Sequence, residues 1–276
     1  MEIKYSARSH VGRIRGNNED NLYVDGVMLT PETRERPFSI DGITRAPAIF
    51  AVFDGIGGED DGERASFLAA QALMEADERI KSATTEQLED IVQSYVREVC
   101  NSISSDVSSL GKRAGTTLAL AVAAHGGVYC YNSGDSRIYA LQVPAFKQIT
   151  NDHTLGAEHI RNGVITEAQA PGLRGGHKLT RCMGIGDITA AESYPPITGD
   201  CRLLICSDGL TDLVGEAEVK AFLQTCASAA DAADLLLRAA LENGGMDNAT
   251  LIVADVKDPE KPFLRSLLKK MKGYRV

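Results

Sequence analysis

Aspartate recurs at the points where apolar segments of this chain end or begin. Asp54 follows the run IFAVF, Asp208 follows LLICS, and Asp247 stands just before ATLIVADV. A carboxylate at the rim of a buried sheet is costly unless it is hydrogen-bonded, paired or bound to a cation. Several that converge raise one another's pKa unless cations neutralise them. Because oxygen donors without His or Cys suit hard ions, the pattern indicates a site for Mg²⁺ or Mn²⁺.

Taken singly, each of these residues has an ordinary structural explanation. The Asp-Gly pairs at 54–55 and 208–209 are common turn signals. Asp247 is typical of a connector between a helix and a strand, Arg15 of a solvated surface, and His153 of a loop or a cap. The metal-site hypothesis therefore depends on the joint presence and the order of the motifs.

The elements that would position these aspartates are segregated along the chain. Apolar, β-branched runs predict strands at 48–53, 202–206 and 249–256, and residues 115–150 follow the pattern of an antiparallel meander. Helical spacing predicts helices at 63–80, 85–110, 216–225 and 229–242, with Thr85 as the N-cap of the second. Strand runs separated from helix runs favour an α+β layered domain over an alternating βαβ fold.

Composition narrows the class of protein. The 276 residues are 43% apolar and 24% charged, as in a globular chain with a real core, and a net charge of −9 argues against nucleic-acid binding. The six cysteines form no CxxC pair, no secretory apolar region opens the sequence, and the longest apolar stretch, Leu118 to Ala124, is too short to span a bilayer. We therefore expect a cytoplasmic protein with reduced thiols.

Residues 257–276 differ from the acidic body over 1–256, because they carry seven Lys or Arg and only two Asp or Glu. The apolar residues of this tail would share one face of a helix, so it has the pattern of a basic amphipathic segment: Phe263, Leu264, Leu267, Leu268 and Met271. Two interpretations stay open. The tail binds an acidic partner or an anionic membrane surface, or, as we favour, it packs on the body of its own chain.

The motifs occur in an order that closely resembles the bacterial form of the metal-dependent type 2C Ser/Thr protein phosphatases. The resemblance covers residues 6–256 and rests on the following segments: RGNNED at 15–20, FDGIGG at 53–58, GTT at 115–117, NSGDSR at 132–137, TNDH at 150–153, LTR at 179–181, SDGLTD at 207–212 and DNAT at 247–250. A full ordered set is specific. The resemblance implies a central antiparallel β-sandwich flanked by helices on both sides, in αββα layers.

The same resemblance implies a centre of two metal ions, Mn²⁺ or Mg²⁺. Asp54 would bridge the two ions, and the backbone carbonyl of Gly55 would bind one of them. Asp208 and Asp247 would hold the other ion. These three aspartates are the residues on which the expected activity depends.

Further site residues are implied around these. Glu19 and Asp20 would act near the metals, Asp20 through water. Asp135 and Asp212, together with Asp208, match a weaker third metal site. Arg15 matches the arginine that clamps the substrate phosphate, where a planar fork suits phosphate oxygens.

In the mechanism that this implies, a water bridging the two cations loses its proton near neutral pH and attacks phosphorus in line. The metals and Arg15 stabilise the equatorial oxygens, so no phosphoenzyme is needed. The chain departs from many eukaryotic members at Ile56, where they carry a histidine that is a candidate general acid. We therefore expect a metal-bound water to protonate the leaving alkoxide, and assign no catalytic part to His153.

The expected function is hydrolysis of phosphoserine and phosphothreonine in proteins by a monomer that opposes a Ser/Thr kinase. Two alternatives stay open. One is a catalytically weak module that binds phosphoproteins, although the intact Asp54, Asp208 and Asp247 argue against it. The other is a small-molecule phosphoesterase, which would share the metal site and differ in its surface.

Two segments are variable in this pattern. Residues 155–178 correspond to a mobile flap beside the active site in the family. Four basic residues there could contact a phosphoprotein, but we favour the interpretation that they are ordinary surface positions: His159, Arg161, Arg174 and His177. Residues 27–47 form a longer polar connection than a hairpin needs, and the sequence assigns them no role.

Overall fold

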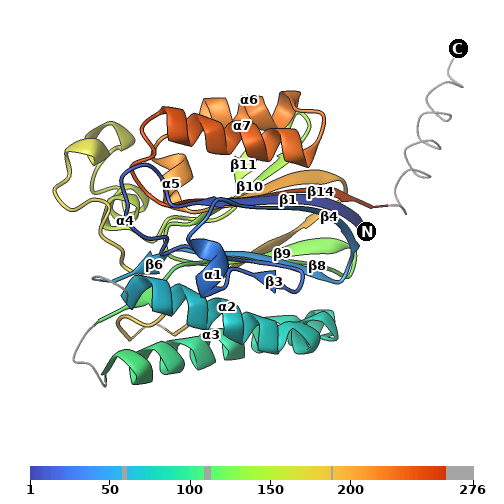
Figure 1. The fold of residues 1–276 in the computed structure, drawn as a ribbon, viewed down its shortest axis with the longest axis horizontal. Helices are drawn as coiled ribbons and strands as arrows, with labels where there is room; N and C mark the ends of the chain where they lie inside the picture. Colours follow the sequence, from blue (N-terminus) through green and yellow to red (C-terminus); the bar gives the residue numbers. More distant parts are fainter. Residues whose placement is uncertain (58–60, 109–112, 188, 259–276) are drawn as a thin grey trace, which may run out of the picture.

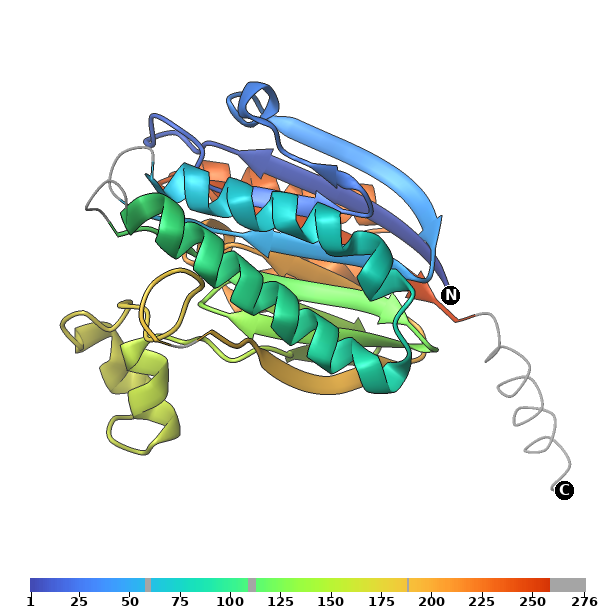
Figure 2. The same cartoon turned by 90° about the horizontal axis from the view of Figure 1, so that it is seen from below.

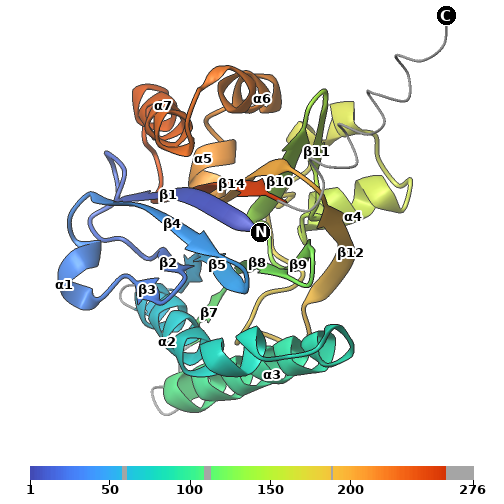
Figure 3. The same ribbon diagram turned by 90° about the vertical axis from the view of Figure 1, so that its right-hand side faces the viewer.

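Two antiparallel β-sheets lie face to face in the centre of the molecule, and helices cover the outer face of each (Figures 1 and 3). A computed structural model describes residues 1–57, 61–108, 113–187 and 189–258. The layers run helix, sheet, sheet, helix, so the expected α+β sandwich is confirmed.

Each large sheet has six strands. The first contains β1 (Glu2–His10), β4 (Phe38–Arg45), β10 (Arg137–Gln142), β11 (Ala145–Gln148), β13 (Cys201–Cys206) and β14 (Ala249–Lys257). The second contains β2 (Asn21–Val24), β3 (Val27–Met28), β5 (Ala48–Phe53), β8 (Leu118–Ala124), β9 (Gly127–Ser133) and β12 (Glu192–Thr198). Their orders are β11-β10-β13-β14-β1-β4 and β12-β9-β8-β5-β2-β3. A short ladder joins β6 (Gly55–Ile56) to β7 (Gly115–Thr116).

The helices divide between the two outer faces. The second sheet is covered by α2 (Asp61–Lys81) and α3 (Thr85–Ser108), which run side by side across it (Figure 2). The first sheet is covered by α5 (Asp208–Thr211), α6 (Glu216–Thr225) and α7 (Ala229–Glu242). Three short helices remain: α1 (Pro31–Arg34), and at one end of the sandwich α4 (Leu155–Arg161) and the 3₁₀ helix η1 (Glu167–Gly172).

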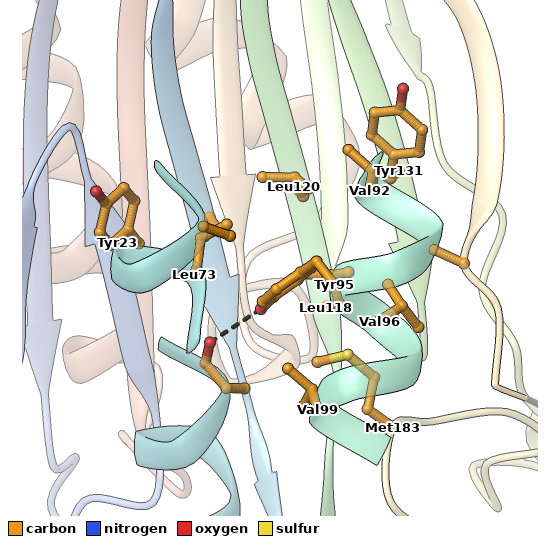
Figure 4. Close-up of a cluster of buried hydrophobic side chains, with 14 of the residues drawn as sticks. Tyr23, Leu73, Val92, Tyr95, Val96, Val99, Leu118, Leu120, Tyr131 and Met183 are labelled. Atoms are coloured by element: carbon orange, nitrogen blue, oxygen red, sulfur yellow. Dashed lines mark hydrogen bonds between the residues drawn. The ribbon is translucent and has the colours of Figure 1, made fainter. Parts of the chain in front are cut away.

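Strands β5 and β8 are buried along their whole length because both of their faces are covered. In β5, Ile49, Ala51 and Phe53 pack toward the α2–α3 layer, while the alternate residues Phe50 and Val52 face the other sheet. This period of two is the reason that the strand reads as a continuous apolar run. Figure 4 shows the outer cluster, where the hydroxyl of Tyr95 donates to the carbonyl of Ala69 at 2.9 Å.

Helix and strand boundaries follow the sequence closely, with differences at the ends. Helices 216–225 and 229–242 and strand 48–53 have the predicted bounds. The N-cap of α3 is Thr84 and not Thr85, because the carbonyl of Thr84 accepts from Leu88 and its N–H donates to Gln87 Oε1 at 3.1 Å. The carbonyl of Thr84 therefore accepts the first hydrogen bond of the helix, one residue earlier than predicted.

The segment 27–47 is not an irregular connection. It supplies β3, then α1, then β4, which pairs with β1 and forms the edge of the first sheet. The predicted amphipathic tail lies outside the described residues from 259 onward. Among the helices of the described ranges, none combines the length and the apolarity needed to cross a membrane.

Candidate metal centre

The predicted aspartates gather where strands of both sheets end. Strand β5 leads directly into Asp54, β13 leads through Ser207 into Asp208, and β14 begins just after Asp247. Strands β13 and β14 are antiparallel, with Cys206 opposite Leu251, so the end of one and the start of the other share one edge. That edge lies beside β6 and α5, near α4 (Figure 1).

Asp54 and Asp208 form the middle of the carboxylate group. Their side chains share a hydrogen bond. Burial raises the pKa of Asp54 well above its ordinary value, and the charges of Asp208, Asp20 and Asp135 raise it further. Burial likewise raises the pKa of Asp208. Two carboxyls placed this close together favour a positive charge beside them.

The neighbouring acids Asp20 and Asp135 also have raised pKa values. Burial, reinforced by Asp208 and Asp247, raises the pKa of Asp20 to about 7, although the hydroxyl of Ser207 donates to it at 2.8 Å. Burial, with Asp208 and Asp152, raises the pKa of Asp135 to about 7.

Asp212 and Glu19 complete the group at its edges. The exposed Asp212 acts on Asp208 through its charge. The pKa of Glu19 is raised mainly by burial and also by Asp247. All of the predicted acidic residues therefore belong to one electrostatically coupled set.

This donor set fits a hard divalent cation. Its side chains offer carboxylate oxygens, and their raised pKa values indicate that added positive charge would be favourable there. Within the described part of the chain, no three acidic, His or Cys side chains already enclose a common point as a finished metal site. The residues that would hold ions are therefore related in the structure by their electrostatic coupling.

Arg15 lies at the mouth of this group. Its guanidinium donates to Asp247 Oδ2 at 2.7 Å, and both side chains are partly exposed. Glu19 and Asp54 also act on it through their charges. A half-exposed arginine beside a carboxylate cluster has the position and the planar fork needed to receive a phosphate group.

Close backbone packing holds the turn after Asp54. A Cβ on Gly55 would lie 2.2 Å from the carbonyl oxygen of Gly62 and 2.5 Å from that of Glu19. Only glycine permits this approach, which brings the first turn of α2 against the Asp54–Gly55 turn. The N–H of Asp54 also donates to the hydroxyl of Thr117 at 2.9 Å.

Asn248 lies in the DNAT motif at 247–250, but the sequence pattern did not indicate its role. Its Oδ1 accepts from the N–H of Glu19 at 2.7 Å, and its Nδ2 donates to the carbonyls of Val11 and Asn17, each at 2.9 Å. This buried amide joins the loop that carries Arg15 and Glu19 to the start of β14. Its position next to Asp247 was the available signal, because Asn and Asp commonly organise backbone turns.

The remaining predicted residues lie around the centre or beyond it. Ile56 pairs with Gly115 in the short β6–β7 ladder. His153 is buried; its Nδ1 accepts from the N–H of Gly134 at 3.0 Å, so its Nε2 donates to Glu192 at 2.7 Å. Both ring nitrogens are therefore engaged in joining segments.

The basic residues of the flap segment are on its outer parts. Arg161, at the end of α4, is exposed and donates to the carbonyl of Asp152 at 2.9 Å. Arg174 and His177, beyond η1, are exposed, and His159 is half-buried in α4.

Family comparison agrees with the fold. Residues 41–243, more than half of the chain, match the family model described as Protein phosphatase 2C. The chain therefore belongs to the protein phosphatase 2C family, and the resemblance drawn from motif order is confirmed.

Particular relatives cover nearly the whole domain. The serine/threonine phosphatase stp of Listeria innocua is 34% identical over 254 residues, which cover 90% of this chain and 94% of that protein. The solved structure of the Mycobacterium tuberculosis serine/threonine phosphatase PstP/Ppp has a TM-score of 0.77 at 28% identity, covering 94% of this chain and 100% of that one. The catalytic domain of PstP in complex with 2 manganese ions has a TM-score of 0.75 at 30% identity, with the same coverage.

Proposed function

We propose that this chain is a metal-dependent phosphatase that removes phosphate from phosphoserine and phosphothreonine in proteins. One observation carries the proposal: carboxylates from the ends of several strands are coupled and short of positive charge, with Arg15 beside them. Relatives named as serine/threonine phosphatases, one of them solved with manganese ions, support the substrate and the metal.

The roles that we assign follow the resemblance to the family and are compatible with the coupling of these carboxylates. Asp54, with the carbonyl of Gly55, and Asp208 and Asp247 would hold two ions of Mn²⁺ or Mg²⁺. Bound there, the two ions would supply an activated water as nucleophile and positive charge for the phosphoryl oxygens. Arg15 orients the phosphate through its planar fork.

The other carboxylates support these ligands. Glu19 and Asp20 belong to the same coupled group, and Ser207 donates to Asp20. Asp135 and Asp212, which both interact electrostatically with Asp208, would form a weaker third site with it. Ile56 has no acidic proton, and both nitrogens of His153 are engaged. Neither side chain would therefore supply the proton of the leaving oxygen, and we assign that proton to a water that bound ions would hold.

The cellular setting is an extension of this proposal. A Ser/Thr phosphatase acts on the products of a Ser/Thr kinase, so we assign this chain to oppose one, as a monomer in the cytoplasm.

The proposal is tested by phosphate release from a phosphothreonine peptide, in Mn²⁺ and in EDTA. Wild type should turn over only with Mn²⁺, and Asp208→Asn should lose more than about 100-fold in kcat/KM, since it loses a metal ligand. Asp90→Asn is the matched control, because Asp90 is exposed on α3. It should keep wild-type activity.

The alternatives predict different outcomes. Folded wild-type protein that binds the peptide but shows no turnover in Mn²⁺ would overturn the enzyme proposal in favour of a phosphoprotein-binding module. Faster turnover of free phosphorylated metabolites than of the phosphopeptide would instead indicate a small-molecule phosphoesterase.

A further inference from the structure

The segment 27–47 places a charged side chain inside the protein. Arg34, the last residue of α1, has a side-chain exposure of 0%. Its Nη1 donates to the backbone carbonyl of Glu63 at 3.0 Å and lies 3.2 Å from the Glu63 carboxylate. Its Nε and Nη2 have no hydrogen-bond partner among the described residues. A buried guanidinium with two unused donors is costly, so its presence calls for an explanation.

Packing alone does not provide that explanation. The guanidinium lies over the ring of Phe67, 5.7 Å from its centroid, one turn further along α2. A methionine or leucine would fill the same space without the cost of removing a charge from water. What an apolar residue would lose is the hydrogen bond and the ion pair to Glu63.

Glu63 belongs to the turn of α2 that packs on the metal centre. A Cβ on the preceding Gly62 would lie 2.9 Å from the carbonyl carbon of Gly55 and 3.1 Å from Cδ of Glu19. The hydroxyl of Ser66 donates both to the carbonyl of Glu19 at 2.6 Å and to that of Glu63 at 3.0 Å. A displacement of this turn would therefore move the backbone of Gly55 and Glu19.

The backbone carbonyl of Arg34 contacts the loop that carries Glu19 and Asp20. Its carbonyl accepts from Nδ2 of Asn18 at 3.4 Å, and Oδ1 of Asn18 accepts from the N–H of Asp20 at 3.2 Å. Asn18 is itself fully buried and also donates to Ser9 at 3.0 Å. Arg34 thus connects the Glu19–Asp20 loop, through Asn18, to the first turn of α2, through Glu63.

We infer that Arg34 is a positioning residue of the metal centre. Through Glu63 and Asn18 it holds the first turn of α2 against Gly55 and the Glu19–Asp20 loop, and its buried positive charge offsets part of the carboxylate charge there. It reaches the centre only through other residues. The inference rests on the proposed metal-dependent function, and it gives the 27–47 segment a role.

The test measures Mn²⁺ binding directly, by calorimetry and by the dependence of Tm on Mn²⁺ concentration. Arg34→Met removes the charge and the donors while keeping an unbranched apolar side chain. Its Kd for Mn²⁺ should rise about 10–100-fold, as is typical when residues supporting metal ligands are removed. Arg34→Lys keeps the charge without the planar fork, and its Kd should fall between those of Arg34→Met and wild type.

Arg202→Met is the matched control. Arg202 pairs with Asp255 and donates to the carbonyls of Leu223 and Cys226, at the opposite end of β13 from Asp208. Its loss should lower Tm in the same manner as the loss of Arg34, but leave the Kd for Mn²⁺ at the wild-type value. Comparison of the two variants separates metal positioning from general stability.

Each outcome decides the inference. A folded Arg34→Met protein that binds Mn²⁺ as wild type does would overturn it and leave Arg34 a stability residue. If Arg34→Met does not fold, Arg34→Lys decides by the same comparison. Wild-type protein that binds no Mn²⁺ would overturn the proposed function and this inference together, and that result is visible in the wild-type arm alone.

Discussion

The guanidinium of Arg15 lies 2.7 Å from the carboxylate of Asp247, so the proposed phosphate clamp is paired with a proposed metal ligand. The two side chains are 49% and 38% exposed, so the pair contributes about 1 kcal/mol or less to stability. A contact this weak is easily exchanged. An ion that takes Asp247 would free Arg15 for phosphate, so filling of the metal site and readiness of the clamp are linked.

Arg15→Ala should therefore affect the substrate and not the metal. We expect KM for a phosphothreonine peptide to rise about 10–100-fold at saturating Mn²⁺, because a charge-assisted phosphate contact of about 1.5–3 kcal/mol is lost. The Kd for Mn²⁺ should not rise, because Arg15 no longer competes with the ion for the carboxylate of Asp247. Steady-state kinetics and calorimetry on the same preparation measure both quantities.

Arg13→Ala is the control for this prediction. Arg13 is exposed two residues away, and its described hydrogen bond is from its backbone N–H to the carbonyl of Gly245, which alanine retains. A KM increase as large as that of Arg15→Ala would mean that general positive charge, and not a specific clamp, attracts the phosphopeptide.

The architecture, and the grouping of the predicted acidic residues at one end of the strands, could be predicted because their signals are local. Asp54 and Asp208 each follow an apolar strand, and the order of the motifs places them in a known fold. The periodicity of 216–225 and 229–242 was sufficient for both bounds, because each helix presents one apolar face to the first sheet.

What could not be predicted depends on contacts between distant segments. Asn248 accepts a hydrogen bond from Glu19, 229 residues away in the sequence. Arg34 donates to the carbonyl of Glu63, and nothing in the sequence around Arg34 indicates that its side chain is buried. Strand β4 has alternating exposure, and its partner β1 is far earlier in the chain. Alternation of this kind can indicate a strand, but it does not identify which distant strand is its partner.

The metal-free protein should lose stability as the pH rises. Asp20 and Asp135 have a pKa of about 7 in the folded protein against 3.8 as the ordinary value, so the folded state binds these protons more tightly. Their contribution is fully present below about pH 4 and is lost as the pH rises through about 7. In EDTA we expect Tm to fall between about pH 5 and pH 7 and then to level off.

Addition of Mn²⁺ should change this trend, because metal ions and protons compete for the same carboxylates. The rise in Tm caused by Mn²⁺ should be larger at pH 8 than at pH 5.5. Asp20→Asn should flatten the fall of Tm in EDTA, whereas Asp90→Asn should leave it unchanged. A Tm in EDTA that stays constant across this range would contradict the raised pKa values.

His153 should act in the opposite direction. Burial lowers the pKa of its imidazole below 6.5, although Glu192 favours the protonated form. The folded state therefore prefers neutral His153, and the stability that this gives is present above about pH 6.5 and is lost as the pH falls. His153→Gln should lower the free energy of unfolding by about 1–3 kcal/mol at pH 8, because buried partners lose their bonds.

The difference between wild type and His153→Gln should shrink when the pH falls below about 6. Urea unfolding at pH 8 and at pH 5.5 measures this difference in the free energy of unfolding. The pH dependence that comes from carboxylates away from His153 is common to both proteins and cancels in the difference. His177→Gln, at an exposed position beyond η1, should match wild type at both values. A difference that grows on acidification would show that the histidine is charged in the folded protein.

Gly209 makes the closest backbone approach in the centre. A Cβ at this position would lie 1.8 Å from the carbonyl oxygen of Asn248 and 3.4 Å from Cβ of Asp247. Asn248 cannot retreat easily, because its side chain is bonded to Glu19 and to two carbonyls. Gly209→Ala should lower the free energy of unfolding by about 1–3 kcal/mol and weaken the response of Tm to Mn²⁺, since it moves Asp208 relative to Asp247.

Gly172→Ala is the matched substitution, because a Cβ there meets no atom within 4 Å and the backbone does not have a positive φ. Its free energy of unfolding should change by less than about 1 kcal/mol, with an unaltered response to Mn²⁺. If Gly209→Ala lowered stability while its Mn²⁺ titration stayed the same as that of Gly172→Ala, Asp208 and Asp247 would not depend on this contact for their spacing. The loss of stability and the loss of metal response should therefore occur together at position 209.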